Sequence, residues 1–340
     1  MDLQVKTQMA DGYSSLLSVY ETQRAIGTLK RLFEDKLCAN LSLYRVSAPL
    51  FVASNTGLND DLNGVESPVS FEIDRVPDKA VVVHSLAKWK RMALHQYGFE
   101  MGTGIVTDMN AIRRNEIQDT IHSAYVDQWD WEKIIKLEDR SLDTLKATAQ
   151  AIVNAVAETQ AALKAMFPQL TSLSDIKTDI KFVTTQELED LYPDAIRKER
   201  ENLIAKEYGT VFIMGVGHKL KSGEAHDGRA PDYDDWNLNG DIVVWNETLQ
   251  IGLELSSMGI RVSPESLAEQ LKLAGCEDRK SLPFHSKLLA GELPYTMGGG
   301  IGQSRISMQL LGKAHIGEVQ VSLWDPDNHE ACEKAGVKLL

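Results

Sequence analysis

The sequence predicts an α+β fold built on a mostly antiparallel sheet. Two strand-like apolar runs, 241–245 and 249–255, are separated by only three residues, as in a hairpin. Longer segments with helical spacing lie between and after such strands, which favours an antiparallel sheet flanked by helices. Regular strand–helix alternation with a GxGxxG turn is missing, so the sequence disfavours a dinucleotide-binding Rossmann unit.

Several segments carry apolar residues at the three- and four-residue intervals typical of helices. The predicted helices are 14–37, 142–167, 187–208 and 263–275, with a further one at 301–311 behind a glycine run. Pro193 after Tyr192 interrupts the third helix, because proline cannot continue a helix. In the fourth, Ser263 is the expected N-cap, Pro264 the first helical residue and Gly275 the end.

Short apolar runs predict the other strands. They are 50–52, 69–76, 80–84, 211–216 and, as the last strand, 318–324. No repeat, linker or composition change marks a boundary, so residues 1–340 are predicted to form a single domain.

The composition is that of an ordinary folded protein, with 43% hydrophobic and 25% charged residues among 340. The chain has 36 Lys and Arg against 49 Asp and Glu, a formal net charge of −13. This acidic excess argues against a nucleic-acid or anionic-membrane binder, since both need surplus Lys and Arg. It still permits a local basic pocket for a small anion.

The cysteines and the apolar runs indicate a cytoplasmic location. The chain has three widely spaced cysteines, Cys38, Cys276 and Cys332. Their odd number and wide spacing predict neither a disulfide framework nor a CxxC metal site. The first 15 residues lack the apolar core of a signal peptide. No apolar run approaches the roughly 18–20 residues needed to span a bilayer.

Polar residues inside strand-like segments are the first candidate site residues. In 125–131, alternation places Gln128 and Asp130 on one face and Trp129 and Trp131 on the other. The tryptophans can then bury against helices while the polar pair faces a cavity, although an amphipathic edge strand gives the same pattern. A carboxylate beside a carboxamide suits recognition of an ammonium or amide group.

Two carboxylates on paired strands form a second candidate. Glu254 and Ser256 are expected to share one strand face, with Asp241 on the preceding strand of the hairpin. Carboxylate oxygens together with water suit a hard cation such as Mg²⁺. No spacing specifies such a site, and a pair of surface carboxylates is the alternative.

A glycine run with a following arginine is the third candidate. Glycines at 298, 299, 300 and 302 allow a backbone to approach a flat or anionic ligand closely. The helix behind them presents free N–H groups, and Arg305 stands about one turn inside it. The pattern is not a Walker loop, and a glycine hinge is the alternative.

Three further polar segments are weaker candidates. They are 111–116, with two arginines and a glutamate, 229–236, with three carboxylates in four positions, and 83–91, where a strand meets a basic helix. The last places Ser85 beside a helix N-terminus, a reasonable corner for a carboxylate. The histidines show no metal-ligand spacing, and His122 and His315 are predicted to be structural.

Six segments together resemble the A-type, ammonia-dependent aspartate–ammonia ligases. They are HSLAKWKR, YVDQWDWE, RAPDYDDW, LNGDIVVWN, ELSSMGIRV and GGGIGQSR. The resemblance covers essentially the whole chain and implies the fold of a class II aminoacyl-tRNA synthetase core and a homodimer. It also implies the reaction of L-aspartate, ATP and ammonia to L-asparagine, AMP and pyrophosphate, with Mg²⁺ and through β-aspartyl-AMP.

The resemblance implies a role for each matching residue. Arg113 would grip the α-phosphate with Glu116 near the adenine, and Arg305 would pack against adenine or the terminal phosphates. The nucleotide-binding set also includes Gly302. Asp241 and Glu254 match the Mg²⁺-associated carboxylates. The positions that match the aspartate-binding residues are Ser85, Lys90, Gln128, Asp130, Asp234, Ser256, Ser257, Arg261, Gly299 and Gly300.

The implied catalytic set is Asp60, Arg113, Gln128 and Arg305, and Asp60 in loop 59–64 is expected to bind or deprotonate ammonium. The chain departs from the family pattern in a short 236–238 connection and in one residue missing before His122. A tRNA-charging asparaginyl or aspartyl synthetase is one alternative, disfavoured by the charge of −13. A catalytically silent paralogue is another. A glutamine-dependent amidotransferase is disfavoured because Asp2 replaces the N-terminal nucleophilic cysteine.

Overall fold

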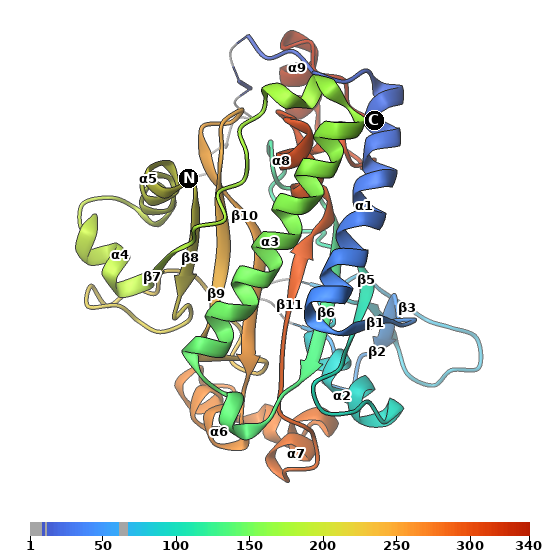
Figure 1. Ribbon diagram of the computed structural model, residues 1–340. Helices are drawn as coiled ribbons and strands as arrows, with labels where there is room; N and C mark the ends of the chain where they lie inside the picture. The colour runs from blue at the N-terminus through green and yellow to red at the C-terminus, as the bar shows by residue number, and fades with distance from the viewer. Residues whose placement is uncertain (1–8, 11, 61–66) are drawn as a thin grey trace.

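A large mixed sheet runs through the computed structural model, which describes residues 9–10, 12–60 and 67–340 (Figure 1). Within this described part, eight strands follow the order β1-β5-β6-β11-β10-β9-β8-β7. Their bounds are β1 Leu43–Arg45, β5 Gly104–Ile112, β6 Tyr125–Ile134, β7 Lys181–Thr184, β8 Thr210–Met214, β9 Asp234–Asn246, β10 Ile251–Arg261 and β11 Thr296–Gly302. A second, smaller sheet has the order β2-β4-β3, with β2 Phe51–Ala53, β3 Ser70–Phe71 and β4 Ala80–Val82.

The pairing of the large sheet is antiparallel in its centre and parallel at both edges. Strands β5, β6, β11, β10, β9 and β8 pair antiparallel with their neighbours in that order. The edge strands β1 and β7 pair parallel with β5 and β8. The predicted antiparallel arrangement therefore holds for the central pairs, and the predicted β9–β10 hairpin is confirmed, with Ile251 opposite Asn246.

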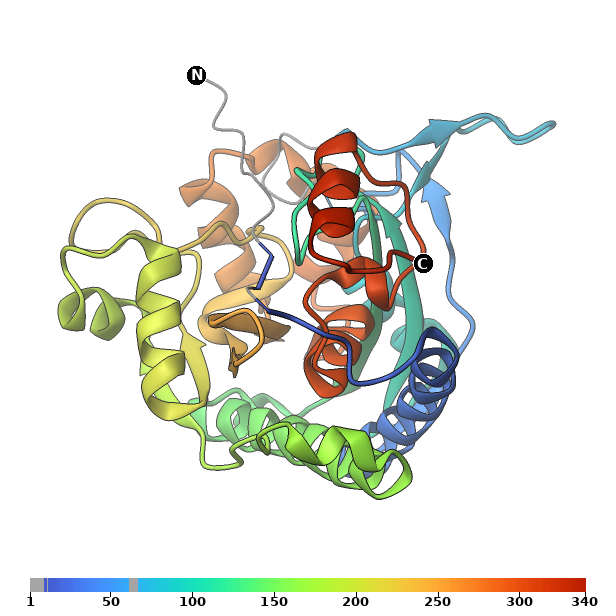
Figure 2. The same ribbon diagram turned by 90° about the horizontal axis from the view of Figure 1, so that it is seen from above.

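Helices α1 (Val19–Leu41) and α3 (Leu142–Met166) pack side by side across one face of the sheet (Figures 1 and 2). Trp129 and Trp131 of β6 are buried in the core beneath them, and the Phe33 and Trp129 ring centroids are 4.6 Å apart. The predicted inward face of β6 is thus confirmed. Burial of large aromatic side chains supplies much of the apolar stabilisation of this layer.

The remaining helices surround the sheet at its ends and edges (Figure 1). They are α2 Ala87–Tyr97, α4 Thr185–Leu191, α5 Arg197–Tyr208, α6 Pro264–Leu273, α7 Pro283–Leu289, α8 Gln303–Leu311 and α9 Pro326–Lys334. The predicted break at Tyr192 and Pro193 is confirmed by the gap between α4 and α5. The predicted cap of α6 is also confirmed, because Ser263 Oγ accepts a hydrogen bond from the Ser266 N–H at 3.1 Å.

Four sequence predictions differ from the structure. Helix α1 begins at Val19 rather than Ser14, because Ser18 and Glu21 form a reciprocal capping box. The 69–76 run forms only the two-residue β3 before a turn with Arg75 at φ 66°. The predicted last strand, 318–324, is wrong. Leu323 is 87% exposed, and the alternating apolar residues of this segment do not pair with any strand that the structure describes.

The fourth difference is the glycine run, which belongs to the central strand β11, so the helix predicted to begin at residue 301 begins at Gln303. Because its glycines have no side chains, β11 leaves room for long side chains from β6 and β10. A Cβ on Gly298 would lie 2.0 Å from Glu132 Oε2, and one on Gly300 would lie 2.4 Å from Gln128 Oε1. The glycines therefore allow neighbouring polar side chains to cross over the strand. In the part of the chain that the structure describes, no helix is long and apolar enough to cross a membrane.

Replacing Gly298 by Ala should destabilise the protein by about 3 kcal/mol, because the new methyl group would push apart the buried Arg261–Glu132 ion pair. The free energy of unfolding can be measured by urea titration. Gly27→Ala is the matched control, since its Cβ meets only Arg31 Nη1 at 3.7 Å and should stabilise α1 by about 0.5–1 kcal/mol. Equal stabilities of the two variants would contradict the packing argument.

Candidate active site

A cavity of about 450 Å³ opens on the side of the sheet that faces away from α1 and α3. Gln128 and Asp130 line it, since they alternate with the buried tryptophans of β6. Most residues predicted for the site come together here. Those that line the cavity are Asp60, Ser85, Lys90, Arg113, Glu116, Gln128, Asp130, Asp234, Asp241, Glu254, Ser257, Arg261, Gly299, Gly300, Gly302 and Arg305.

Ser256 is the exception: it does not line the cavity, and the prediction that it shares a strand face with Glu254 is wrong. A β-bulge between Glu254 and Ser256 shifts the alternation of β10 by one residue. Ser256 is buried on the core side, where its hydroxyl donates to the Gly300 carbonyl at 3.0 Å. Ser257, rather than Ser256, therefore faces the cavity together with Glu254.

Lys90 and Asp130 form a buried ion pair at one end of the cavity. Lys90 Nζ lies 3.1 Å from Asp130 Oδ2 and donates to the Gly299 carbonyl at 3.0 Å. Burial lowers the pKa of Lys90, and the Asp130 carboxylate opposes that shift. Asp130 also accepts the Leu86 N–H at the start of α2, at 3.3 Å. Its Oδ1 has no hydrogen-bond partner among the described residues, so it can accept a hydrogen bond from a ligand.

Arg261 is held by two carboxylates beneath the cavity. Its Nη2 lies 2.7 Å from Glu132 Oε2 and its Nη1 lies 2.5 Å from Asp234 Oδ1. Its guanidinium also lies 5.8 Å from the Tyr233 ring centroid. Because its nitrogens are already engaged, Arg261 fixes the position of Asp234.

Asp241 and Glu254 face the cavity from paired strands. Burial raises the pKa of Asp241 to about 6, and the like charge of Glu254 adds to this, whereas Arg229 opposes it. The described residues contain no group of three or more His, Cys, Asp or Glu side chains that could hold a metal. Two carboxylates nevertheless fit a Mg²⁺-type ion, which commonly takes one or two carboxylates plus waters and substrate phosphates.

Arg113 and Arg305 approach the cavity from different elements. Arg113 follows β5, with Nη1 3.8 Å from Glu116 Oε2, and its buried Nε has no hydrogen-bond partner in the described part of the chain. Arg305 lies in the first turn of α8 behind Gly302, and its Nη1 donates to the Glu254 carbonyl at 3.1 Å. Both guanidiniums can grip phosphate groups bidentately.

Asp60 is buried at the edge of the cavity, 1% exposed. Its carbonyl lies 3.1 Å from His84 Nδ1. Burial raises the pKa of Tyr233, with the charge of Asp60 as the next cause, so the phenol and the carboxylate lie near each other. The rest of the predicted loop, 61–64, lies outside the described residues.

The cavity is not the local basic pocket that the acidic total of the chain still permitted. Among its described lining residues, six are Lys or Arg and eight are Asp or Glu. A polyanionic nucleotide would therefore meet net repulsion unless cations accompany it. Divalent metal bound with the nucleotide is the simplest source of that charge.

Sequence reasoning missed several residues that line the cavity. Arg229 and Tyr233 belong to the segment RAPDYDDW, where only the carboxylates drew attention, and Arg197 and Asp227 carry no motif. His122, predicted to be structural, also lines the cavity and lies 2.9 Å from Asp119. His315 is buried against Asn328 at 3.0 Å, as expected of a structural histidine.

The fold matches that of solved asparaginyl-tRNA synthetases. The enzyme of Entamoeba histolytica in complex with asparaginyl-adenylate superposes with a TM-score of 0.66 at 13% identity, covering 89% of this chain and 66% of that chain. The Pyrococcus horikoshii enzyme with asparaginyl-adenylate superposes with a TM-score of 0.64 at 16% identity, covering 90% of this chain and 70% of that chain. The chain therefore has the fold of the class II synthetase core.

The sequence comparisons specify the family. The family model described as aspartate–ammonia ligase matches residues 20–336, and the chain belongs to this family. The aspartate–ammonia ligase of Clostridium perfringens is 58% identical over 330 residues, covering 97% of this chain and 98% of that protein. The Lactobacillus acidophilus ligase is 56% identical over 339 residues, covering 99% of this chain and 100% of that protein. The chain is thus an enzyme.

Proposed function

We propose that this enzyme makes L-asparagine from L-aspartate, ammonia and ATP through a β-aspartyl-AMP intermediate, releasing AMP and pyrophosphate. The observation that carries the proposal is one continuous cavity that joins three groups of residues. Lys90, Asp130 and Asp234 suit an amino acid, Asp241 and Glu254 suit a metal, and the arginines suit phosphates. Residues 1–340 are proposed to act as one catalytic domain. The cysteine pattern supports a cytoplasmic location.

The nucleotide would lie between Arg113 and Arg305. Arg113 would hold the α-phosphate, where negative charge develops as the carboxylate of aspartate attacks, with Glu116 near the adenine. Mg²⁺ at Asp241 and Glu254 would neutralise the phosphates and favour departure of pyrophosphate. Gly302 leaves the start of α8 open to the nucleotide.

Aspartate would bind at the other end of the cavity. Asp130 and Asp234 are buried carboxylates that suit the α-ammonium group, while Lys90 and the start of α2 at Ser85 suit the α-carboxylate. Gly299 and Gly300 leave the space in which the substrate lies. Gln128 extends over Gly300, where its amide N–H would stabilise the oxygen of the acyl group during ammonia attack.

Asp60 would bind ammonium and take its proton. Ammonium is the main form at neutral pH, and only neutral ammonia attacks the acyl-adenylate. A carboxylate that is nearly fully buried can both bind the cation and accept the proton. Its placement beside Tyr233 keeps this step on the amino-acid side of the cavity.

The proposed reaction predicts that aspartate, ATP, Mg²⁺ and ammonium together yield asparagine with equal amounts of AMP and pyrophosphate. Chelating the divalent metal should stop the reaction, because the acidic cavity then repels the nucleotide. Chromatography of nucleotides and amino acids measures all products. Release of ADP and phosphate would contradict the adenylate route.

The two half-reactions should separate the roles of Asp60 and Arg113. Asp60→Asn should lower asparagine formation about a hundredfold while aspartate-dependent ATP–pyrophosphate exchange continues. Arg113→Ala should instead lower the exchange itself by about a hundredfold. Equal loss in both half-reactions for Asp60→Asn would count against an ammonia-specific role.

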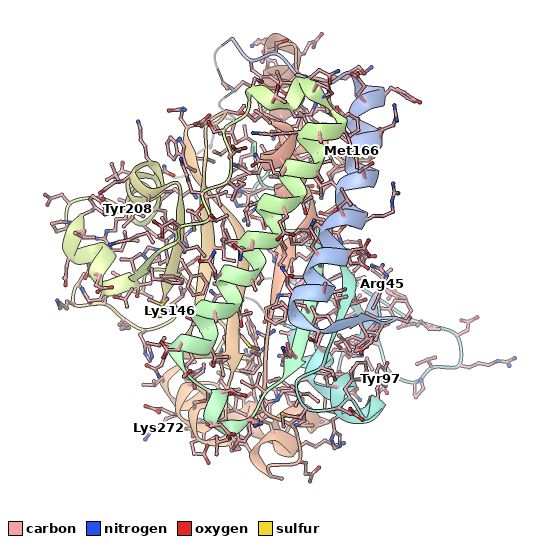
Figure 3. All side chains as sticks on the ribbon, in the orientation of Figure 1. Arg45, Tyr97, Lys146, Met166, Tyr208 and Lys272 are labelled. Carbon is pink, nitrogen blue, oxygen red and sulfur yellow. The ribbon has the colours of Figure 1, made fainter. Side chains whose placement is uncertain are left out.

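We also propose that the enzyme is a homodimer that associates through the edge formed by β1, β2 and β3 (Figure 1). Tyr44 is 61% exposed there and Phe51 40% exposed. Figure 3 shows Tyr97 and Arg45 projecting at the same edge. Exposed aromatic side chains gathered in one region are typical of a protein interface.

Tyr44→Arg combined with Phe51→Arg should weaken the dimer about tenfold or more, since two buried charges would face each other across the interface. Light scattering over a concentration series measures the association. Leu191→Arg is the control, because this exposed leucine ends α4 on the opposite side of the sheet. An unchanged dimer in the double variant would show that another surface is used.

A further inference from the structure

Arg229 lies between the amino-acid end and the metal end of the cavity. Its Nη2 donates to Asp241 Oδ1 at 2.5 Å, and its Nη1 donates to Ser257 Oγ. Its Nη1 also lies 3.9 Å from Asp234 Oδ2. The side chain is 9% exposed, so this positive charge is largely removed from solvent.

The backbone that carries Arg229 is held on both sides. Before it, Asp227 pairs with Arg197, and His226 Nε2 lies 3.2 Å from Glu201 Oε1. After it, the buried Asp232 carboxylate lies 3.1 Å from Lys88 Nζ. A change of partner by Arg229 would therefore be a rotation of its side chain, without displacement of the segment.

Arg229 and a metal ion require the same carboxylate. The guanidinium already neutralises Asp241, and a divalent cation bound there would stand next to a fixed positive charge in a poorly screened site. Metal binding thus requires the guanidinium to turn away from Asp241. Away from Asp241, the largely buried guanidinium would keep only the distant Asp234 carboxylate, 3.9 Å from its Nη1 and already paired with Arg261, so a further anion would stabilise it.

We infer that Arg229 competes with the metal for Asp241 and transfers to the phosphates of the nucleotide when the metal takes that carboxylate. The inference rests on the proposed metal site and adds a role for a residue that the sequence motifs did not indicate. Its Nε is buried without a hydrogen-bond partner in the described part of the chain, so an additional N–H is available for a bidentate phosphate contact. Metal and nucleotide would then each favour binding of the other.

The test measures the affinities of the purified enzyme for Mn²⁺ and for ATP in separate experiments. Arg229→Gln should bind Mn²⁺ without nucleotide about tenfold more tightly, because the competing charge is gone. The same variant should bind ATP about tenfold more weakly at saturating Mg²⁺, because the phosphate partner that becomes available when the metal takes Asp241 is lost. Electron paramagnetic resonance reports free Mn²⁺, and calorimetry reports ATP. A misfolded variant would not change the two affinities in opposite directions.

Arg200→Gln is the matched control. Arg200 is also a largely buried arginine, with Nη1 3.3 Å from Glu189 Oε1, but it lies outside the cavity lining. Both affinities should stay at the wild-type value in this variant. Arg229→Lys keeps the charge and should keep Mn²⁺ binding weak.

Asp241→Asn separates failure of the inference from failure of the metal site. If Asp241→Asn removes Mn²⁺ binding while Arg229→Gln leaves it unchanged or weaker, the competition is overturned and the metal site stands. If Mn²⁺ binds equally well to Asp241→Asn, or to none of the variants, the proposed metal site is overturned and the inference with it.

Discussion

The site depends on charged side chains that are buried around a strand without side chains of its own. Strand β11 lies between β6 and β10, and its glycines leave open the volume over which Arg261 reaches Glu132. A buried ion pair contributes little unless its geometry is satisfied, and breaking one is costly. This pair also holds Asp234 through Arg261, so the packing of β11 determines where a cavity carboxylate points.

The same arrangement explains why two groups of polar side chains from distant strands line one cavity. Side chains from β6 reach over β11 from one side, and those of β9 and β10 line the cavity from the other. Gln128 and Asp130 thereby line the part of the cavity proposed for the amino acid, and Asp241 and Glu254 line the part proposed for the metal. Rigid strands hold polar groups more accurately than loops do, which suits a reaction that must orient two substrates.

Local rules predicted the elements that depend on local chemistry. The break after Tyr192, the Ser263 cap and the inward tryptophans of β6 follow from proline geometry, capping and alternation. The rest depends on tertiary contacts. Glycine disfavours strands, so the sequence of β11 does not indicate a strand until its neighbours are known. One extra residue at the β10 bulge moves Ser256 into the core.

Most site residues were predicted from matching motifs, because spacing alone could not bring strands so distant in sequence together. Arg229 stayed hidden for a physical reason: its importance comes from lying against Asp241 and not from its own neighbours in the chain. The net charge shows the same limit. A total of −13 argues against a broad nucleic-acid surface, but it does not say that the cavity itself carries more carboxylates than cations. Under the proposed function, that local excess is the reason to expect that the nucleotide binds together with a divalent metal.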